Sequence, residues 1–352
     1  MASRDERRIL ATIKDVAKRA GVAISTVSAV INRSAPVSEE TVARVEKAVA
    51  EIGYTPHGAA QSLRSGRSRM IGLIMPTIFN PHFATAARII ENVCLAAGYM
   101  SVVYSTGEDS ERENQILKMM RMQRVAGLII IPSASKAEHG ARLNAEIHVP
   151  TVLLDSFVAG MPHDVVKLDN VKATRIAIDY LIGLGHRRIG VLAGTHGIAT
   201  NDDRLTGYLD ALEAAGLPIE SDLIYEAKFQ RYLAYEGARA LMSMKKPPSA
   251  LFALSNLMTL GMMQAVTELK LKVPEDVSIA GIDDFDWAEI TSPKLTVVSV
   301  PIADMAQLAI KTLLEEMETG KAPTGKRTLF QPKLVVRGSC APVAAMEPAH
   351  QV

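Results

Sequence analysis

Hydroxyl, amide and carboxylate side chains follow nearly every short apolar segment of the chain after residue 70. Fixed donors and acceptors of this kind match the hydroxyl groups of a sugar ring, and an aromatic ring can cover the apolar face of the sugar. The sequence therefore indicates a binding site for a small polyol. The residues in these positions are Thr77, Phe79, Asn80, Ser105, Thr106, Ser133, Asp155, Ser156, Phe157, Thr195, His196, Ser255, Asn256 and residues 283–287.

Most of these residues have a simpler alternative role, because Ser, Thr and Asn at the end of a strand commonly cap a helix or form a turn. Two charged residues are stronger candidates for ligand contacts. Asp283 follows a predicted strand and Arg204 opens a predicted helix. A charge close to a cleft needs a partner, so we expect both residues to contact the ligand.

The chain lacks the common motifs of catalytic and nucleotide-binding sites. Neither GxGxxG nor GxxxxGKS/T nor GxSxG occurs, and the eight histidines have no metal-site spacing. His186 lies between a predicted helix and a predicted strand, where a structural role is expected. Asp283 and Asp284 are adjacent at a strand end, so their side chains should point apart. We expect no enzymatic activity, no metal and no cofactor.

A second group of candidate binding residues lies near the N-terminus, on a segment with helical periodicity. Its hydroxyl and amide groups are of the kinds that bond to phosphates and base edges of DNA. The polar residues are Ser25, Thr26, Ser28 and Asn32. The apolar stripe of the same helix is Val27, Val30 and Ile31.

The neighbouring segments complete a unit of three helices. Residues 13–20 predict a first helix, which Gly21 ends because glycine readily adopts a positive φ. The tight turn before the second helix, 24–32, is typical of a helix-turn-helix, whose second helix lies in the DNA major groove. An ordinary helical corner in a globular core is the alternative. A third helix is expected at 39–52, with Ser38 as its N-cap.

From residue 70 onward, apolar runs of strand length alternate with amphipathic helical stretches, which indicates parallel sheets covered by helices on both faces. About 270 residues exceed a single core, so we expect two similar, doubly wound α/β lobes. Strands are predicted at 70–75, 100–104, 126–131, 150–154, 165–168, 188–193, 250–254, 277–282, 296–299 and 334–336. Helices are predicted at 82–97, 111–124, 136–145, 171–184, 203–215, 232–244, 257–269 and 302–318.

These patterns divide the chain into a headpiece, a linker, a core and a tail that should be disordered. The boundaries are 11–56 for the headpiece, 57–69 for the linker, 70–340 for the core and 341–352 for the tail. Lobe 1 is expected at about 70–168 and 300–328, and lobe 2 at about 169–299 and 329–340. Residues 57–64 form either a short helix or a plain tether. The face of helix 82–97 that we expect to be buried carries Phe83, Ala87, Ile90, Cys94 and Ala97.

Charge is unevenly divided along the chain. Residues 1–70 hold twelve Lys and Arg against seven Asp and Glu, a net charge of +5, and the remainder has a net charge of −4. A basic N-terminal part indicates a polyanion partner for that part only. The two cysteines form no disulfide framework, and the sequence shows neither a secretory signal nor an apolar run of membrane-spanning length. We expect a cytoplasmic protein without a membrane partner.

The chain resembles the LacI/GalR family of bacterial transcription repressors from residue 12 to about 338, in motifs that follow the family's order. The motifs are TIKDVAKRAGV, STVS and VIN within 12–32, VSEETVARVEKAVAEIGYTP at 37–56, AAQSLRSGRSRMIGLIMP at 59–76, NPHFA at 80–84, QRVAGLIIIP at 123–132, LIGLGHRRIGVLAG at 181–194, DRLTGYLDAL at 203–212 and VPEDVSIAGIDDFDWAEITSPKLTVVSVP at 273–301.

The resemblance implies a helix-turn-helix headpiece, a hinge helix and a core similar to periplasmic sugar-binding proteins. It makes AAQSLRS a helix that orders on operator DNA, where Leu63 would enter the minor groove beside the partner subunit's Leu63. It also implies a homodimer on near-palindromic double-stranded DNA and a carbohydrate effector between the lobes. The DNA-binding residues expected are Thr12, Ile24, Ser25, Thr26, Ser28, Ala29, Asn32, His57, Gln61 and Leu63. The effector-binding residues expected are Phe79, Phe83, Ser133, Asp155, Arg204, Asn256, Asp283 and Trp287.

The headpiece departs from the family pattern where it should read DNA. The serine that usually precedes the recognition helix is Ala23, and loss of such a cap costs about 1 kcal/mol. The base-reading positions match Ile24, Ser25 and Ala29, of which two are apolar. Contact with thymine methyl groups is therefore favoured over bidentate readout of guanine.

Two further departures affect the linker and the cleft. In the hinge, His57 occupies a position where the family frequently has asparagine, and Gln61 occupies one where it frequently has arginine. In the cleft, Ser255 and Asn256 occupy the positions of the family's usual Asn-Asp pair, so one negative charge is absent.

We therefore predict a dimeric repressor that binds operator DNA and is controlled by a sugar or sugar acid, whose binding changes the angle between the lobes. The alternative is a solute-binding protein for a sugar, which the basic headpiece and the absence of a signal peptide disfavour. An α/β enzyme that acts on a sugar is disfavoured because no nucleophile, metal site or phosphate loop is found.

Overall fold

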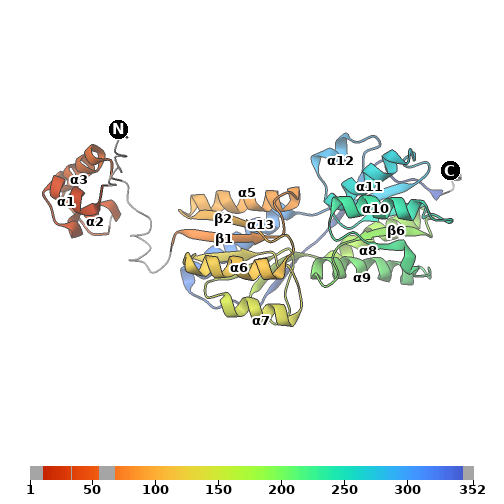
Figure 1. Cartoon of the computed structure of the whole chain (residues 1–352), viewed down its shortest axis with the longest axis horizontal. Coiled ribbons are helices and arrows are strands. Elements are labelled where there is room, and N and C mark those ends of the chain that lie inside the picture. Colours follow the sequence, from red (N-terminus) through yellow and green to blue (C-terminus); the bar gives the residue numbers. More distant parts are fainter. Residues whose placement is uncertain (1–10, 33, 55–67, 344–352) are drawn as a thin grey trace, which may run out of the picture. The chain divides into compact units, whose positions relative to one another are not determined.

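The computed structural model of the chain describes residues 11–32, 34–54 and 68–343 (Figure 1). The chain divides into two compact units, a headpiece up to Ser68 and a core from Arg69 onward. The predicted hinge helix, with His57, Gln61 and Leu63, lies outside the described residues.

The headpiece has its three helices where the sequence predicts them: α1 (Ile13–Ala20), α2 (Ile24–Asn32) and α3 (Glu39–Ile52). Val16 of α1, Val27 of α2 and Val45 of α3 are fully buried against one another. Gly21 ends α1 with a φ of 65°, as expected. Arg44 of α3 donates hydrogen bonds to the carbonyl groups of Ala20 and Gly21, so the third helix closes the turn.

The cap of α3 differs from the prediction. Ser38 does precede the helix, but its side chain makes no hydrogen bond to the backbone of the first turn. Its hydroxyl lies 2.9 Å from the hydroxyl of Thr41 instead.

Lobe 1 is a sheet of six parallel strands in the order β11-β5-β4-β3-β1-β2. The strands are β1 (Met70–Met75), β2 (Met100–Ser105), β3 (Gly127–Ile130), β4 (Thr151–Leu154), β5 (Asp164–Leu168) and β11 (Arg327–Phe330). Helices cover both faces, α5 and α13 on one side and α6 and α7 on the other (Figure 1). The helices are α5 (Pro81–Ala96), α6 (Ser110–Met122), α7 (Ala137–Glu146) and α13 (Ile302–Thr319).

Lobe 2 repeats this plan in the order β12-β10-β9-β8-β6-β7, in which β12 alone is antiparallel to its neighbour. Its strands are β6 (Ile189–Ala193), β7 (Ile224–Glu226), β8 (Ala250–Ala253), β9 (Ser278–Ile282), β10 (Thr296–Ser299) and β12 (Lys333–Val335). The pair α8 and α9 lies across the sheet from the pair α10 and α11 (Figure 1). The helices are α8 (Asn170–Gly183), α9 (Ala199–Ala214), α10 (Arg231–Met242), α11 (Asn256–Glu268), the short α12 (Asp286–Ile290) and a 3-10 turn at Ser221–Leu223.

Two predicted boundaries are wrong by a few residues. The chain leaves lobe 1 after β11, which pairs with β5 up to Phe330, and not at residue 328. The predicted disordered tail begins too early, because the amide of Ala341 donates to Ser278 Oγ and that of Val343 donates to the carbonyl of Leu184. Residues 344–352 lie outside the described part of the chain.

The buried face of α5 agrees with the prediction at Ile90 and Cys94 and differs from it at the other positions. The fully buried positions repeat every four residues and are His82, Ala86, Ile90 and Cys94. Phe83 and Ala87 are only half-buried, and Ala97 is exposed beyond the end of the helix. A histidine is not expected on a core-facing stripe, and the reason for its burial lies in the cleft between the lobes.

Close packing of α8 against α9 predicts a large effect for one small substitution. A Cβ atom on Gly207 would lie 2.1 Å from the carbonyl oxygen of Val171, so Gly207→Ala should destabilise the core by about 1–3 kcal/mol. Gly183→Ala is the matched control, since a Cβ there meets no atom within 4 Å. Urea unfolding should separate the two variants, and equal stability would mean that the helices can move apart without cost.

Candidate functional site

The two sheets direct the carboxyl ends of their strands toward one cavity between the lobes. The cavity has an empty volume of about 630 Å³, part of which is open to solvent. Such clefts at the carboxyl ends of parallel strands are the usual ligand sites of α/β proteins. Polar residues from lobe 1 (Thr77, Asn80, His82, Asp155) face polar residues from lobe 2 (Thr200, Arg204, Ser255, Asp283).

Two buried carboxylates are held in equivalent positions in the two lobes. Asp155 follows β4 and Asp283 follows β9, and each side chain is only 5% exposed. Both backbones have a positive φ, 64° and 82° respectively, while their amide groups still pair with the neighbouring strands. A positive φ outside glycine is uncommon and clusters at ligand sites. The turn after each strand therefore fixes a carboxylate at the cavity.

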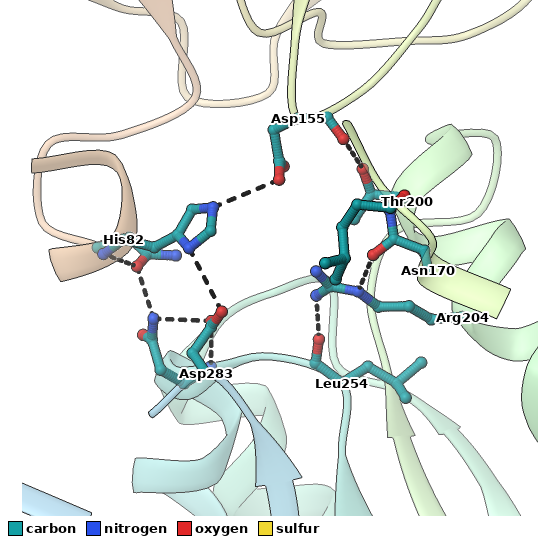
Figure 2. A network of polar contacts seen from close by, with 10 residues as sticks. His82, Asp155, Asn170, Thr200, Arg204, Leu254 and Asp283 are labelled. Carbon is teal, nitrogen blue, oxygen red and sulfur yellow. Dashed lines mark hydrogen bonds and ion pairs between the residues drawn. The ribbon is translucent and has the colours of Figure 1, made fainter. Parts of the chain in front are cut away.

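His82, near the start of α5, joins the two carboxylates (Figure 2). Its Nε2 lies 3.3 Å from Asp155 Oδ1, and its Nδ1 lies 3.3 Å from Asp283 Oδ1. Burial by itself would lower the pKa of His82, but the adjacent carboxylates outweigh burial and raise it to about 9. Burial would raise the pKa of both aspartates, but His82 and Arg204 hold each below its ordinary value. At neutral pH the imidazolium and both carboxylates are therefore charged.

Arg204 is the second buried cation of the cavity and is 4% exposed. Its Nε donates to Asn170 Oδ1 at 2.8 Å, and Nη1 donates to the carbonyl of Leu254 (Figure 2). Helix α9 begins four residues earlier than predicted, at Ala199, whose amide donates to Ser135 Oγ of lobe 1 at 2.6 Å. Arg204 thus lies in the second turn of α9 and does not open it.

Hydrogen bonds also connect the lobes at the cavity. Asn256 Nδ2 donates to Asn80 Oδ1 at 2.6 Å and to Asp283 Oδ2 at 3.1 Å, and the Thr200 hydroxyl donates to the carbonyl of Asp155 at 3.2 Å. Asp283 Oδ1 makes no hydrogen bond but forms the ion pair with His82. Of the buried side-chain atoms at the cavity in the described part of the chain, Ser156 Oγ and Asn256 Oδ1 have no hydrogen-bond partner. These atoms are available to the polar groups of a ligand.

Half of the predicted effector-binding residues line the cavity, namely Phe83, Asp155, Arg204 and Asp283. Asn256 borders the cavity through its bond to Asp283. Ser133 does not line the cavity. It is buried, its amide donates to Glu113 Oε1, and its hydroxyl donates to the hydroxyl of Thr106. Phe79 and Trp287 do not line the cavity. Phe79 is 86% exposed, and the Trp287 ring stacks on the ring of Phe285.

The aromatic rings that line the cavity are those of the predicted Phe83 and of Phe229. Phe229 was not predicted, because it lies between β7 and α10 with a φ of 53° and belongs to no regular element. A Cβ on Gly194 would lie 2.2 Å from its ring, so this glycine makes room for it. His82 was also missed, and the only signal for it was its place in the NPHFA motif two residues after Asn80.

The sequence hypotheses for His186 and Asp284 are confirmed by the packing. His186 is fully buried and bonds to Ser249 Oγ and Ser278 Oγ, which is a structural role. Asp284 pairs with Arg337 and so points away from the partners of Asp283. Among the described residues no three His, Cys, Asp or Glu side chains could share a metal ion. None of the described helices has the length and apolar character to cross a membrane.

The headpiece presents its predicted DNA-binding residues unevenly. Ile24 is 45% exposed and Ser25 is exposed at the start of α2, whereas Thr26 and Ala29 are half-buried. Ser28 is only 7% exposed, so it faces the headpiece interior. The hydroxyl and amide of Thr12 both donate to Asp15 Oδ2, at 2.7 and 2.8 Å, and so cap α1. Asn32 ends α2, but its side chain lies outside the described part of the structure.

Comparison with known proteins matches both units. The family of bacterial regulatory proteins of the lacI type matches residues 12–57, and the periplasmic binding protein-like domain matches residues 178–340. The HTH-type transcriptional repressor PurR of Aliivibrio salmonicida is 34% identical over 333 residues, which cover 94% of this chain and 99% of that protein. The ribose operon repressor of Haemophilus influenzae is 33% identical, with coverages of 94% and 98%.

Solved structures are similar over nearly the whole chain. The lac repressor dimer bound to operator and the anti-inducer ONPF has a TM-score of 0.83 at 26% identity, covering 94% of this chain and 99% of that one. The complex of the transcriptional regulator CelR with cellobiose has a TM-score of 0.69 at 29% identity, with the same coverages.

Proposed function

This chain belongs to the LacI family of bacterial transcriptional repressors, which bind DNA, and we propose that a sugar or related polyol in the interlobe cavity controls its affinity for operator DNA. The observation that carries the proposal is the composition of the cavity. Charged carboxylates, a guanidinium and hydroxyl groups lie there beside two aromatic rings. Such a wall offers both acceptors and donors to the hydroxyl groups of a sugar.

Two of the similar proteins have names that point to a carbohydrate effector. One relative is a ribose operon repressor, and one structural neighbour is a complex with cellobiose. We extend this ligand class to the present chain because its cavity has matching chemistry.

Control of DNA binding would operate through the contacts between the lobes. The pairs His82–Asp283 and Asn80–Asn256 each join one lobe to the other at the cavity. A ligand that prefers one arrangement of these pairs shifts the equilibrium between lobe angles. Lobe 1 is the lobe that the chain enters from the linker, so a change in its angle would reach the predicted hinge helix.

We further propose a homodimer that places two α2 helices on the half-sites of a near-palindromic operator. The similarity to the lac repressor dimer bound to operator supports this assembly. Ile24 and Ala29 would contact thymine methyl groups, which favours half-sites with A·T pairs at those positions.

The test combines ligand binding with DNA binding. The full-length protein is melted against a panel of sugars, sugar acids, polyols and nucleosides, where a ligand at 100 times its Kd adds about 2.7 kcal/mol of stability. Any stabilising compound is then tested for its effect on the affinity for operator DNA. No response to any carbohydrate would contradict the proposed effector class, and DNA affinity independent of salt would contradict phosphate contacts.

Leu63→Ala is expected to weaken operator binding roughly tenfold or more and to leave non-specific binding nearly unchanged, because an apolar wedge supports a kink only in the specific complex. Fluorescence anisotropy with operator and scrambled duplexes measures both affinities. Arg67→Ala is the control, because we expect this cation of the same linker to attract the phosphates of any sequence, so that its loss should weaken both duplexes alike. An equal loss on both duplexes for Leu63→Ala would contradict the wedge role.

A further inference from the structure

We propose that His82 determines the charge specificity of the cavity: it acts as a fixed cation between Asp155 and Asp283, so that the site prefers an uncharged ligand to a cationic one. The inference rests on the proposed function, because it concerns the ligand of the same cavity. It assigns His82 a role in selecting the ligand rather than in packing.

The position of the imidazole between two carboxylates favours its charged form. Both ring nitrogens lie 3.3 Å from a carboxylate oxygen, Nε2 from that of Asp155 and Nδ1 from that of Asp283. A neutral imidazole has a single N–H, so its other nitrogen would direct a lone pair at a negative oxygen. The imidazolium forms a hydrogen bond with Asp155 and an ion pair with Asp283, whereas a neutral ring would place an uncharged nitrogen beside two buried carboxylates.

The buried charges around the cavity then cancel. His82 and Arg204 are cations, Asp155 and Asp283 are anions, and each of the four is at most 5% exposed. Glu108 also lines the cavity, but it is only half-buried and accepts a hydrogen bond from the Thr195 hydroxyl at 2.8 Å. The four buried charges therefore give no net attraction to a cation, which would lose its hydration on entering.

Arg204 cannot replace His82 in this role. Its Nε and Nη1 are held in lobe 2 by Asn170 and by the carbonyl of Leu254. The imidazole of His82, in contrast, reaches from lobe 1 to Asp283 of lobe 2. Without the His82 imidazolium, the remaining buried groups of the cavity carry one excess negative charge. The ammonium group of a ligand could then occupy the position of the imidazolium.

The protonation state of His82 is the first test. In full-length protein labelled with ¹³C-histidine, the His82 resonance is assigned through its contact with the Phe83 ring, whose centroid is 5.2 Å away. We expect an imidazolium at pH 7.5. A neutral imidazole at that pH would overturn the proposal, and this measurement needs neither a ligand nor a variant.

Ligand selectivity is the second test. The probes are D-glucose against D-glucosamine and D-galactose against D-galactosamine, together with any sugar found by melting and its amino counterpart. In His82→Asn the ratio of the two Kd values should shift toward the amino sugar by about tenfold or more, because a nearby cation has been removed. His139→Asn is the control, since His139 pairs with the buried Glu113 of lobe 1 and does not line the cavity.

The outcomes separate this inference from the proposed function. An unchanged ratio in His82→Asn would overturn the role of His82 while leaving a sugar effector in place. Failure of every sugar to bind the unmodified protein would contradict the proposed effector, and the protonation state of His82 would then decide the inference. The same measurement decides it if His82→Asn does not fold.

Discussion

Arg204→Ala is expected to weaken effector binding by roughly 30-fold or more, because truncating one partner of a buried, hydrogen-bonded charge costs about 2–5 kcal/mol. Arg204 lies at the cavity wall and is anchored there by Asn170 and by the carbonyl of Leu254. The alanine variant would lose the only guanidinium that lines the cavity in the described part of the chain. It would also leave the two anchoring oxygens without this donor.

Calorimetry with the ligand found by thermal melting measures this effect. Arg204→Met keeps most of the aliphatic stem and should show a similar loss of affinity. Arg142→Ala is the control, since this half-exposed arginine pairs with the exposed Glu111 and should contribute little. A folded Arg204→Ala protein that binds the effector normally would exclude Arg204 as a contact.

The stability of the core is expected to fall as the pH rises from about 7 to above 9. His82 has a pKa raised from its ordinary value of 6.5 to about 9, so the folded core holds this proton more tightly than the unfolded chain. Its contribution is complete below pH 6.5 and is lost as the pH rises through about 9. The difference between the two pKa values corresponds to roughly 3 kcal/mol.

Other groups titrate outside this window or close to its two ends, and Glu316, whose pKa burial raises to about 7, lies at the lower end. The lowered pKa values of Asp155 and Asp283 add stability above their ordinary pKa of 3.8, which is lost only on acidification. Burial raises the pKa of Cys94 and Cys340 to about 11, which destabilises the fold further from about pH 9 upward. The decisive quantity is therefore the difference between the unmodified protein and His82→Asn.

Urea unfolding at pH 7, 8 and 9 gives this difference. The free energy of unfolding should fall with pH in the unmodified protein and in His139→Asn, and should be nearly constant in His82→Asn. Parallel pH profiles for the unmodified protein and His82→Asn would show that His82 has an ordinary pKa.

Local patterns in the sequence were sufficient for the architecture. The three headpiece helices follow from apolar stripes such as Val16 to Ala20 and from a glycine that must end α1 with a positive φ. The strands that lie inside the sheets were found because residues buried on both faces form continuous apolar runs. β7 and β11 were missed because they are short edge strands, and β11 alternates between exposed and half-buried residues.

The sequence by itself also determined that Asp155, Arg204 and Asp283 belong to one site, because strand ends in parallel sheets converge and buried charges need partners. Only the tertiary structure decided how these charges are balanced. His82 is far in sequence from both aspartates and comes between them only when the lobes meet. Likewise, Ser135 of lobe 1 caps α9, and Phe229 reaches the cavity from a loop whose backbone no periodic pattern describes. Contacts between distant segments leave no local signal, so the folded arrangement alone defines them.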